Sequence, residues 1–328
     1  MRSSKPLGTV SLDLDNQWAY MRVYGDPGWA QFPSYLGRVV PHILQLLDEQ
    51  KLTITVFVVG QDAALDANRE PIAAIAAAGH EIGNHSFDHL PWMHLYPEED
   101  LERELARSEE QIACVTQRHP IGFRGPGFSL STPLLRVLGR RGYLYDATTF
   151  PTFIGPLART FYFAQARFDA QQAEKLKGLY GGLRDGLRPL RPYLWKMEQG
   201  GLVELPVTTF PLLRLPIHLS YLLYLGQFSR SLALVYFRAA LRLCWLTGTP
   251  VSLLLHPTDF LGGDEIPEMA FFPGMQLSGN AKRALVHEVL ELMRASFEIL
   301  PLADYAHTQL QTGSMVLKVP KFVSDHGV

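Results

Sequence analysis

Two acidic residues, Asp13 and Asp15, end an apolar segment near the start of the chain and are separated only by Leu14. Residues i and i+2 of an extended chain point to the same side, so both carboxylates can face one cavity. Two carboxylates this close repel each other unless a cation lies between or beside them. The pair is therefore either two solvated acids in a turn or part of a cation site.

Two histidines, His85 and His89, are four residues apart in the segment Asn84-His85-Ser86-Phe87-Asp88-His89. On a helical turn this spacing brings both imidazoles to one side. The chain has eleven histidines, so such a pair can arise by chance, and the argument depends on the acids that end another segment. Two histidines and one aspartate leave positions open for water and substrate, which is typical of a catalytic metal site.

Three further apolar segments end in polar groups, namely Arg124-Gly125-Pro126-Gly127, Asp146 and His256-Pro257. Two glycines around a proline predict a tight turn with exposed backbone N–H groups. Taken separately, Arg124 could cap a helix and a lone His256 could be structural.

The elements that must position these groups alternate along the chain, which predicts a parallel sheet with crossover helices. Eight strands are expected, at 9–14, 52–59, 80–83, 121–123, 143–145, 202–207, 251–255 and 297–300. The clearest helices are expected at 41–50, 71–78 and 97–118, with Pro41 in the first turn of its helix. Eight strands favour a closed or nearly closed α/β barrel, in which the chemistry gathers at the carboxyl ends of the strands.

These segments, in this order, resemble the polysaccharide deacetylase family (carbohydrate esterase family 4, NodB-like). The matching residues are Asp13 and Asp15, His85-Ser86-Phe87-Asp88-His89, Arg124-Gly125-Pro126, Asp146 and Leu254-Leu255-His256-Pro257. The resemblance implies a distorted (β/α)7–8 barrel and a hydrolase that removes an N-acyl group from a sugar. It also implies that Asp15, His85 and His89 bind a divalent metal ion. Zinc is the expected ion, and cobalt, nickel, manganese or iron also suits this ligand set.

The same resemblance implies four catalytic residues. Asp13 would be the general base that activates water, and Arg124 would orient it and keep it ionised. His256 would be the general acid that protonates the departing amine, and Asp146 would set its protonation. Pro126 and Gly127 would contact the substrate, with the Gly127 N–H available as an oxyanion donor.

The sequence departs from the family pattern in two places. Leu14 separates acids that are adjacent in many members, as in the branch that acts on small or lipid-linked sugars. Gly127 replaces an aromatic residue that many members have after the proline, so only a backbone role remains there.

The net charge of −2 over 328 residues argues against a dedicated nucleic-acid binder, and two cysteines are too few for a disulfide framework. The charge is uneven, however. Residues 157–245 contain twelve basic and five acidic residues, a net charge of +7, which leaves −9 for the rest. This segment also has fourteen of the 36 aromatic residues. We expect one domain over 1–328, with 157–245 as a basic, aromatic-rich insert.

Such an insert suits an anionic membrane surface or a lipid phosphate, although residues 232–246 could equally be an ordinary core helix with solvated arginines. No segment is typical of a signal peptide or a membrane span, which predicts a cytoplasmic protein, peripheral on the inner face of the cell membrane. The expected substrate is then an N-acetyl or N-formyl amino sugar on a polyprenyl phosphate carrier. The alternatives are an amidohydrolase acting on a small cyclic amide or ureide, and a non-catalytic barrel that binds glycans or lipids.

Overall fold

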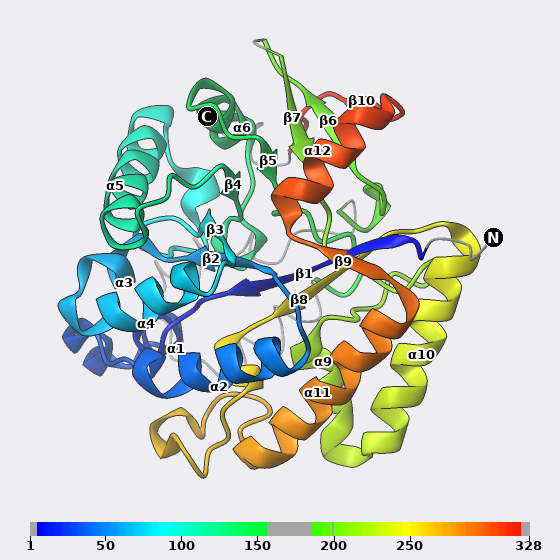
Figure 1. The fold of residues 1–328 in the computed structure, drawn as a ribbon. Helices are drawn as coiled ribbons and strands as arrows, with labels where there is room; N and C mark the ends of the chain where they lie inside the picture. The colour runs from blue at the N-terminus through cyan, green and yellow to red at the C-terminus, as the bar shows by residue number, and fades with distance from the viewer. Residues whose placement is uncertain (1–4, 156–184, 199, 323–328) are drawn as a thin grey trace.

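A ten-stranded sheet forms the centre of the protein in the computed structural model, which describes residues 5–155, 185–198 and 200–322 (Figure 1). Its strands follow the order β10-β6-β7-β5-β4-β3-β2-β1-β8, and β9 pairs with β1. The strands are β1 (Leu7–Asp13), β2 (Thr55–Val58), β3 (Glu81–Asn84), β4 (Gly122–Phe123), β5 (Tyr145–Asp146), β6 (Tyr193–Lys196), β7 (Gly201–Glu204), β8 (Val251–Leu255), β9 (Glu298–Leu300) and β10 (Val316–Lys318).

Every pairing in this sheet is parallel except that of β6 with β7, which form an antiparallel pair. The chain after β7 then approaches β8. Thr208 N donates to Ser252 O at 3.1 Å, and Ser252 N donates to the Thr208 hydroxyl at 2.8 Å. These bonds bring β7 and β8 together, so the sheet curls into a nearly closed barrel, as predicted.

Helices surround the strands (Figure 1). They are α1 (Gln17–Tyr24), α2 (Leu36–Glu49), α3 (Gly60–Ala64), α4 (Asp66–Ala77), α5 (Glu98–Thr116), α6 (Thr132–Arg140), α9 (Leu219–Phe228), α10 (Arg230–Thr247), α11 (Gly279–Ser296) and α12 (Leu302–Thr312). No helix in the described part of the chain is both long enough and apolar enough to span a bilayer.

All eight predicted strands are present, so the predicted fold class is confirmed, but several boundaries and two strands were not foreseen. Strands β6 and β10 were missed, because short strands of mixed polarity lack a clear alternating pattern. The position of Pro41 was also wrong, since α2 begins five residues earlier and contains Pro41 in its interior. Burial of Leu36 and Val39 extends this helix toward its N-terminus.

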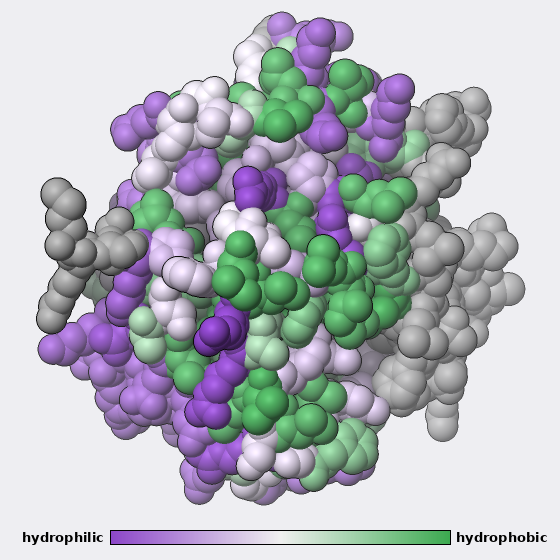
Figure 2. All heavy atoms as spheres, turned by 90° about the vertical axis from the view of Figure 1, so that its right-hand side faces the viewer, coloured by the Kyte–Doolittle hydropathy of each residue, from purple (hydrophilic) through white to green (hydrophobic). Residues whose placement is uncertain are grey.

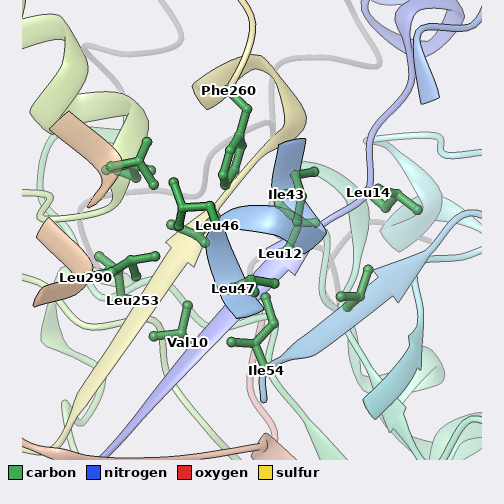
Figure 3. Close-up of a cluster of buried hydrophobic side chains, with 14 of the residues drawn as sticks. Val10, Leu12, Leu14, Ile43, Leu46, Leu47, Ile54, Leu253, Phe260 and Leu290 are labelled. Atoms are coloured by element: carbon green, nitrogen blue, oxygen red, sulfur yellow. The ribbon is translucent and has the colours of Figure 1, made fainter. Parts of the chain in front are cut away.

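Successive side chains of β1 point alternately into the hydrophobic core and into the barrel, where the candidate catalytic groups lie. Val10, Leu12 and Leu14 are fully buried and lie among the side chains of α2, β8 and α11 (Figure 3). Ser11 and Asp13 alternate with them and therefore point to the other side of the strand, into the barrel. The pairing of β1 with β2 and β8 fixes this register, and a shift by one residue would place the carboxylate in the apolar core.

The segment 157–245 contributes β6, β7, α9 and α10 to the same sheet and core. Helix α10 buries Phe237, Leu241 and Cys244 in the main hydrophobic cluster, so its inner face is an ordinary core face. Residues 156–184 lie outside the described residues, so the prediction of a continuous insert stays a prediction.

Candidate metal centre and active site

The groups predicted to bind a metal meet at the carboxyl ends of β1 and β3. The Asp15 carboxylate lies 2.9 Å from His89 Nε2 and 3.3 Å from His85 Nε2, and the two imidazole centres are 5.0 Å apart. One ligand atom from each residue lies within 4.8 Å of the others, and all three residues are buried. Three convergent donors of this kind fit a divalent ion with open coordination positions.

The hydrogen bonds around His85 also fit metal binding. His85 Nδ1 lies 2.7 Å from the carbonyl oxygen of Arg124, which can only accept, so the proton belongs on Nδ1. The lone pair of Nε2 is then free to face the Asp15 carboxylate. A backbone acceptor that fixes the tautomer in this way is the usual companion of a histidine ligand.

The loop that presents the two histidines is not the helical turn that the spacing predicted, and this expectation was wrong. Ser86 and His89 both have left-handed backbone conformations, with φ values of 62° and 50°. Glu104 of α5 stabilises the loop by accepting the backbone N–H groups of Phe87 and Asp88, at 3.0 and 2.7 Å. The side chains meet because α5 buttresses an irregular loop, a contact that the spacing does not encode.

Burial alone would raise the pKa of Asp15, but the adjoining imidazoles of His89 and His85 hold it well below its usual range. The Tyr20 hydroxyl of α1 lies 3.2 Å from the second carboxylate oxygen. Asp15 is therefore ionised over the whole physiological range and is a competent ligand.

The second carboxylate, Asp13, is held by a buried arginine. Arg124 Nη1 lies 2.7 Å from Asp13 Oδ1 and 2.8 Å from the Ser11 hydroxyl, and Arg124 Nε donates to Ala147 O at 2.9 Å. The guanidinium is fully buried over the ring of Phe57, with 4.4 Å between its Cζ and the ring centre. Asp13 Oδ2 remains on the side of His85, 3.9 Å from Nε2. The predicted pairing of Arg124 with Asp13 is thus present, and one oxygen of the carboxylate stays available.

His256 lines the same cavity from the end of β8, and its partners differ from the predicted one. Its Nδ1 lies 3.2 Å from the hydroxyl of Ser220 at the start of α9, and that hydroxyl donates to Asp259 Oδ1 at 2.7 Å. Asp259 Oδ2 accepts the backbone N–H of His256 at 2.8 Å. The ring centre of a second imidazole, His218, lies 6.5 Å from that of His256. Burial and, to a smaller extent, the nearby His256 lower the pKa of His218 to about 3. His218 is therefore neutral.

Asp146, predicted to act on His256, lies at the end of β5 and points elsewhere. Its Oδ1 accepts the Thr148 hydroxyl at 2.5 Å, and Thr148 in turn accepts the backbone N–H of Gly125 at 2.8 Å. Burial raises the pKa of Asp146 well above its usual range, and the neighbouring Glu204 raises it further. In the described structure Asp146 thus supports the turn after Arg124, while Asp259 contacts His256 through Ser220.

The turn after Arg124 places Gly127 on the cavity wall, whereas Pro126 is buried beneath it. Gly127 has a φ of 58°, and the hydrogen bonds that close the turn are donated by Phe128 and Ser129. The Gly127 N–H is therefore not used within the turn, and its role toward substrate stays a prediction.

The cavity has a volume of about 340 Å³ and a mainly apolar wall. Tyr20 and Phe272 form one aromatic pair in it, with ring centres 4.7 Å apart, and Phe128 and Phe150 form another at the same distance. No lysine or arginine is among the described residues that line it. Sequence reasoning missed Tyr20, Phe272 and Ser220, because none of them directly ends a strand: Tyr20 and Ser220 lie on α1 and α9, and Phe272 lies in a loop.

Comparison with known proteins agrees with this architecture. Residues 26–145 match the family model described as polysaccharide deacetylase. This matched part includes His85, His89 and Arg124, whereas Asp13, Asp15 and His256 lie outside it.

Two curated bacterial proteins are similar to part of the chain. It is 27% identical over 144 residues to a peptidoglycan deacetylase of Helicobacter pylori, and 26% identical over 139 residues to a peptidoglycan-N-acetylglucosamine deacetylase of Bacillus cereus. These matches cover 43% and 42% of this chain but 48% and 61% of the relatives. The similarity therefore spans only about half of each protein.

Solved structures match nearly the whole fold. A polysaccharide deacetylase structure from Mycobacterium smegmatis aligns with a TM-score of 0.63 and 22% identity over 98% of this chain and 96% of that one. A probable polysaccharide deacetylase from Pseudomonas aeruginosa aligns at 0.59 with 15% identity, over 94% and 92% of the chains. Puue allantoinase aligns at 0.56 with 14% identity, over 94% and 91%. Residues 26–145 thus resemble polysaccharide deacetylases in sequence, and nearly the whole chain shares the fold of these solved structures.

Replacement of one histidine should remove the metal. We expect the purified protein to bind zinc and His89→Ala to weaken zinc affinity by about 100-fold or more. Even the loss of a residue that only hydrogen-bonds to a metal ligand lowers metal affinity by about 10–100-fold. Competition with a chromophoric chelator measures the affinity. His119→Ala, at an exposed histidine, is the control. Equal affinity in the His89→Ala and control variants would show that the triad does not hold the ion.

Proposed function

We propose that the protein is a metal-dependent hydrolase that removes an N-acyl group, acetyl or formyl, from an amino sugar. One observation carries this proposal. A buried ion pair holds Asp13 beside, but apart from, the Asp15–His85–His89 cluster, and His256 lines the same cavity. Metal-assisted amide hydrolysis uses a base, an acid and a polarising cation within one cavity, and a binding module has no need of all three.

A bound divalent ion would polarise the acyl oxygen and acidify water. The chain's own groups account for the proton transfers. Asp13 Oδ2, the oxygen that Arg124 does not bind, takes the proton from the attacking water. His256 donates a proton to the departing nitrogen, and its Nδ1 is held by the Ser220 hydroxyl. The Gly127 N–H would stabilise charge on the acyl oxygen.

The substrate class is supported by the two curated relatives, whose names describe deacetylases of peptidoglycan and of its N-acetylglucosamine. We propose further that the sugar is attached to a lipid carrier through phosphate and is met at the cytoplasmic face of the membrane. The apolar cavity wall and the basic composition of residues 157–245 support this. Since the described wall has no cationic side chain, the phosphate would lie outside this part of the cavity.

The role of Asp13 is tested by an isosteric change. Asp13→Asn keeps the shape of the side chain but removes the base, so we expect kcat for release of acetate or formate to fall by about 10²–10⁴-fold. Asp48→Asn, at an exposed acid, is the control, and thermal melting shows whether each variant is folded.

The same assay compares free and lipid-phosphate-linked N-acetyl and N-formyl amino sugars, with a small cyclic ureide as a third class. A higher kcat/KM on the lipid-linked sugar than on the free sugar supports the proposal that the substrate is attached to a lipid carrier. Release from the ureide alone, or equal rates in wild type and Asp13→Asn, would refute the sugar deacylase.

Ser220 is a positioning residue for His256, and its loss should affect turnover rather than binding. Removing one hydrogen bond costs about 0.5–1.5 kcal/mol, so Ser220→Ala should lower kcat roughly 2–10-fold with little change in KM. Ser220→Thr retains a hydroxyl and should restore most of the rate, and Ser231→Ala on the exposed start of α10 is the control. A change confined to KM would contradict this role.

A further inference from the structure

The arginines of the segment 185–245 fall into two groups, and those of the first group make internal contacts. Arg188 pairs with Asp185 at 2.8 Å and lies over the rings of Trp195 and Phe322. Arg191 donates to Thr247 O at 2.7 Å, and Arg214 donates to Arg188 O at 2.9 Å. These three arginines join parts of the barrel, so they are poor candidates for contact with an external anion.

The second group lies on the outer face of α10. The inner face of this helix is buried, but Leu232, Val235, Trp245 and Leu246 are 51–62% exposed on the other side. Leu232, Val235 and Leu246 recur at helical spacing, so they form one stripe, about 21 Å long at 1.5 Å per residue. Water is an unfavourable environment for such a stripe, and large exposed apolar surfaces usually mark a contact with a partner.

The charges on this face are all of one sign. Helix α10 contains three arginines and no acidic residue. Among the ion pairs of the described residues α10 contributes one, from Arg230 to Glu288 of α11, and the exposed Arg238 and Arg242 take part in none. Both point outward among the apolar residues. Figure 2 views the molecule from the side on which α10 lies and shows hydrophobic residues gathered there between hydrophilic ones.

We propose that the outer face of α10 (Leu232, Val235, Arg238, Arg242, Trp245 and Leu246) docks the protein on an anionic lipid surface. Apolar and tryptophan side chains would enter the interface, and the two arginines would meet lipid phosphates. A second copy of this chain is a poorer occupant, because two such faces would bring like charges together with no acid between them.

The docking face is connected to the candidate active site through α9. Ser220 and Tyr221, at the start of α9, line the cavity, and Phe228, at its end, is exposed where α10 begins. A membrane-bound α10 would therefore place the cavity near the lipid surface. The idea that this placement helps the enzyme reach a lipid-linked sugar rests on the proposed function. The docking of α10 on lipid does not, because it needs no substrate.

Vesicle sedimentation tests the docking. We expect the full protein to sediment with phosphatidylcholine vesicles that contain phosphatidylglycerol and to bind pure phosphatidylcholine much more weakly. Loss of two arginines at an anionic surface should lower the partition coefficient of Arg238→Gln/Arg242→Gln by roughly 30-fold. Trp245→Ser/Leu246→Ser should weaken binding to both vesicles.

The matched control is Lys51→Gln/Arg103→Gln, which removes the same charge from two exposed positions, one directly after α2 and one on α5. No binding by wild type, or equal loss in the control, would overturn the proposal. So would a wild-type dimer, seen by sedimentation velocity, that Trp245→Ser/Leu246→Ser dissociates without any effect on vesicle binding. Vesicle binding without deacylation of any sugar would refute the proposed function and leave the docking intact.

Discussion

The buried ion pair between Arg124 and Asp13 is the contact on which the rest of the site depends. Arg124 reaches from the end of β4 across the barrel to β1, and it also bonds the backbone after β5. Its guanidinium is fully buried, so loss of either partner would leave an uncompensated charge, at a cost of about 3–5 kcal/mol. The pair therefore fixes three strand ends relative to one another, and it also keeps Asp13 apart from the candidate metal ligands.

This constraint gives different environments to two carboxylates only two residues apart. Asp13 faces a permanent cation, while Asp15 faces two imidazoles that hold its pKa low. An acid bound to a metal could not also accept a proton readily, so in the proposed mechanism this separation would leave Asp13 as the base. His256 follows β8, which pairs with β1 on the side opposite β2. It is held by Ser220 of α9 and by Asp259 of the turn after β8.

Much of this could be predicted from the sequence, because strand alternation and the convergence of parallel strand ends are local rules. They placed Asp13, Asp15 and His256 around one cavity, with Arg124 buried beside Asp13. Contacts made by distant helices could not be predicted in this way. The loop that carries His85 and His89, in which Ser86 and His89 have positive φ values, is stabilised by Glu104. The side-chain partner of His256 is Ser220 rather than Asp146. Neither relation leaves a spacing signal along the chain.

The central claim is that Asp13, bound to Arg124, stays apart from a three-residue metal site. Anomalous diffraction at the zinc edge from crystals of the zinc-loaded protein tests it most directly. We expect one peak in contact with the Asp15 carboxylate and with Nε2 of His85 and His89, while Asp13 remains paired with Arg124. A peak coordinated by Asp13, or none within reach of the two histidines, would contradict the account.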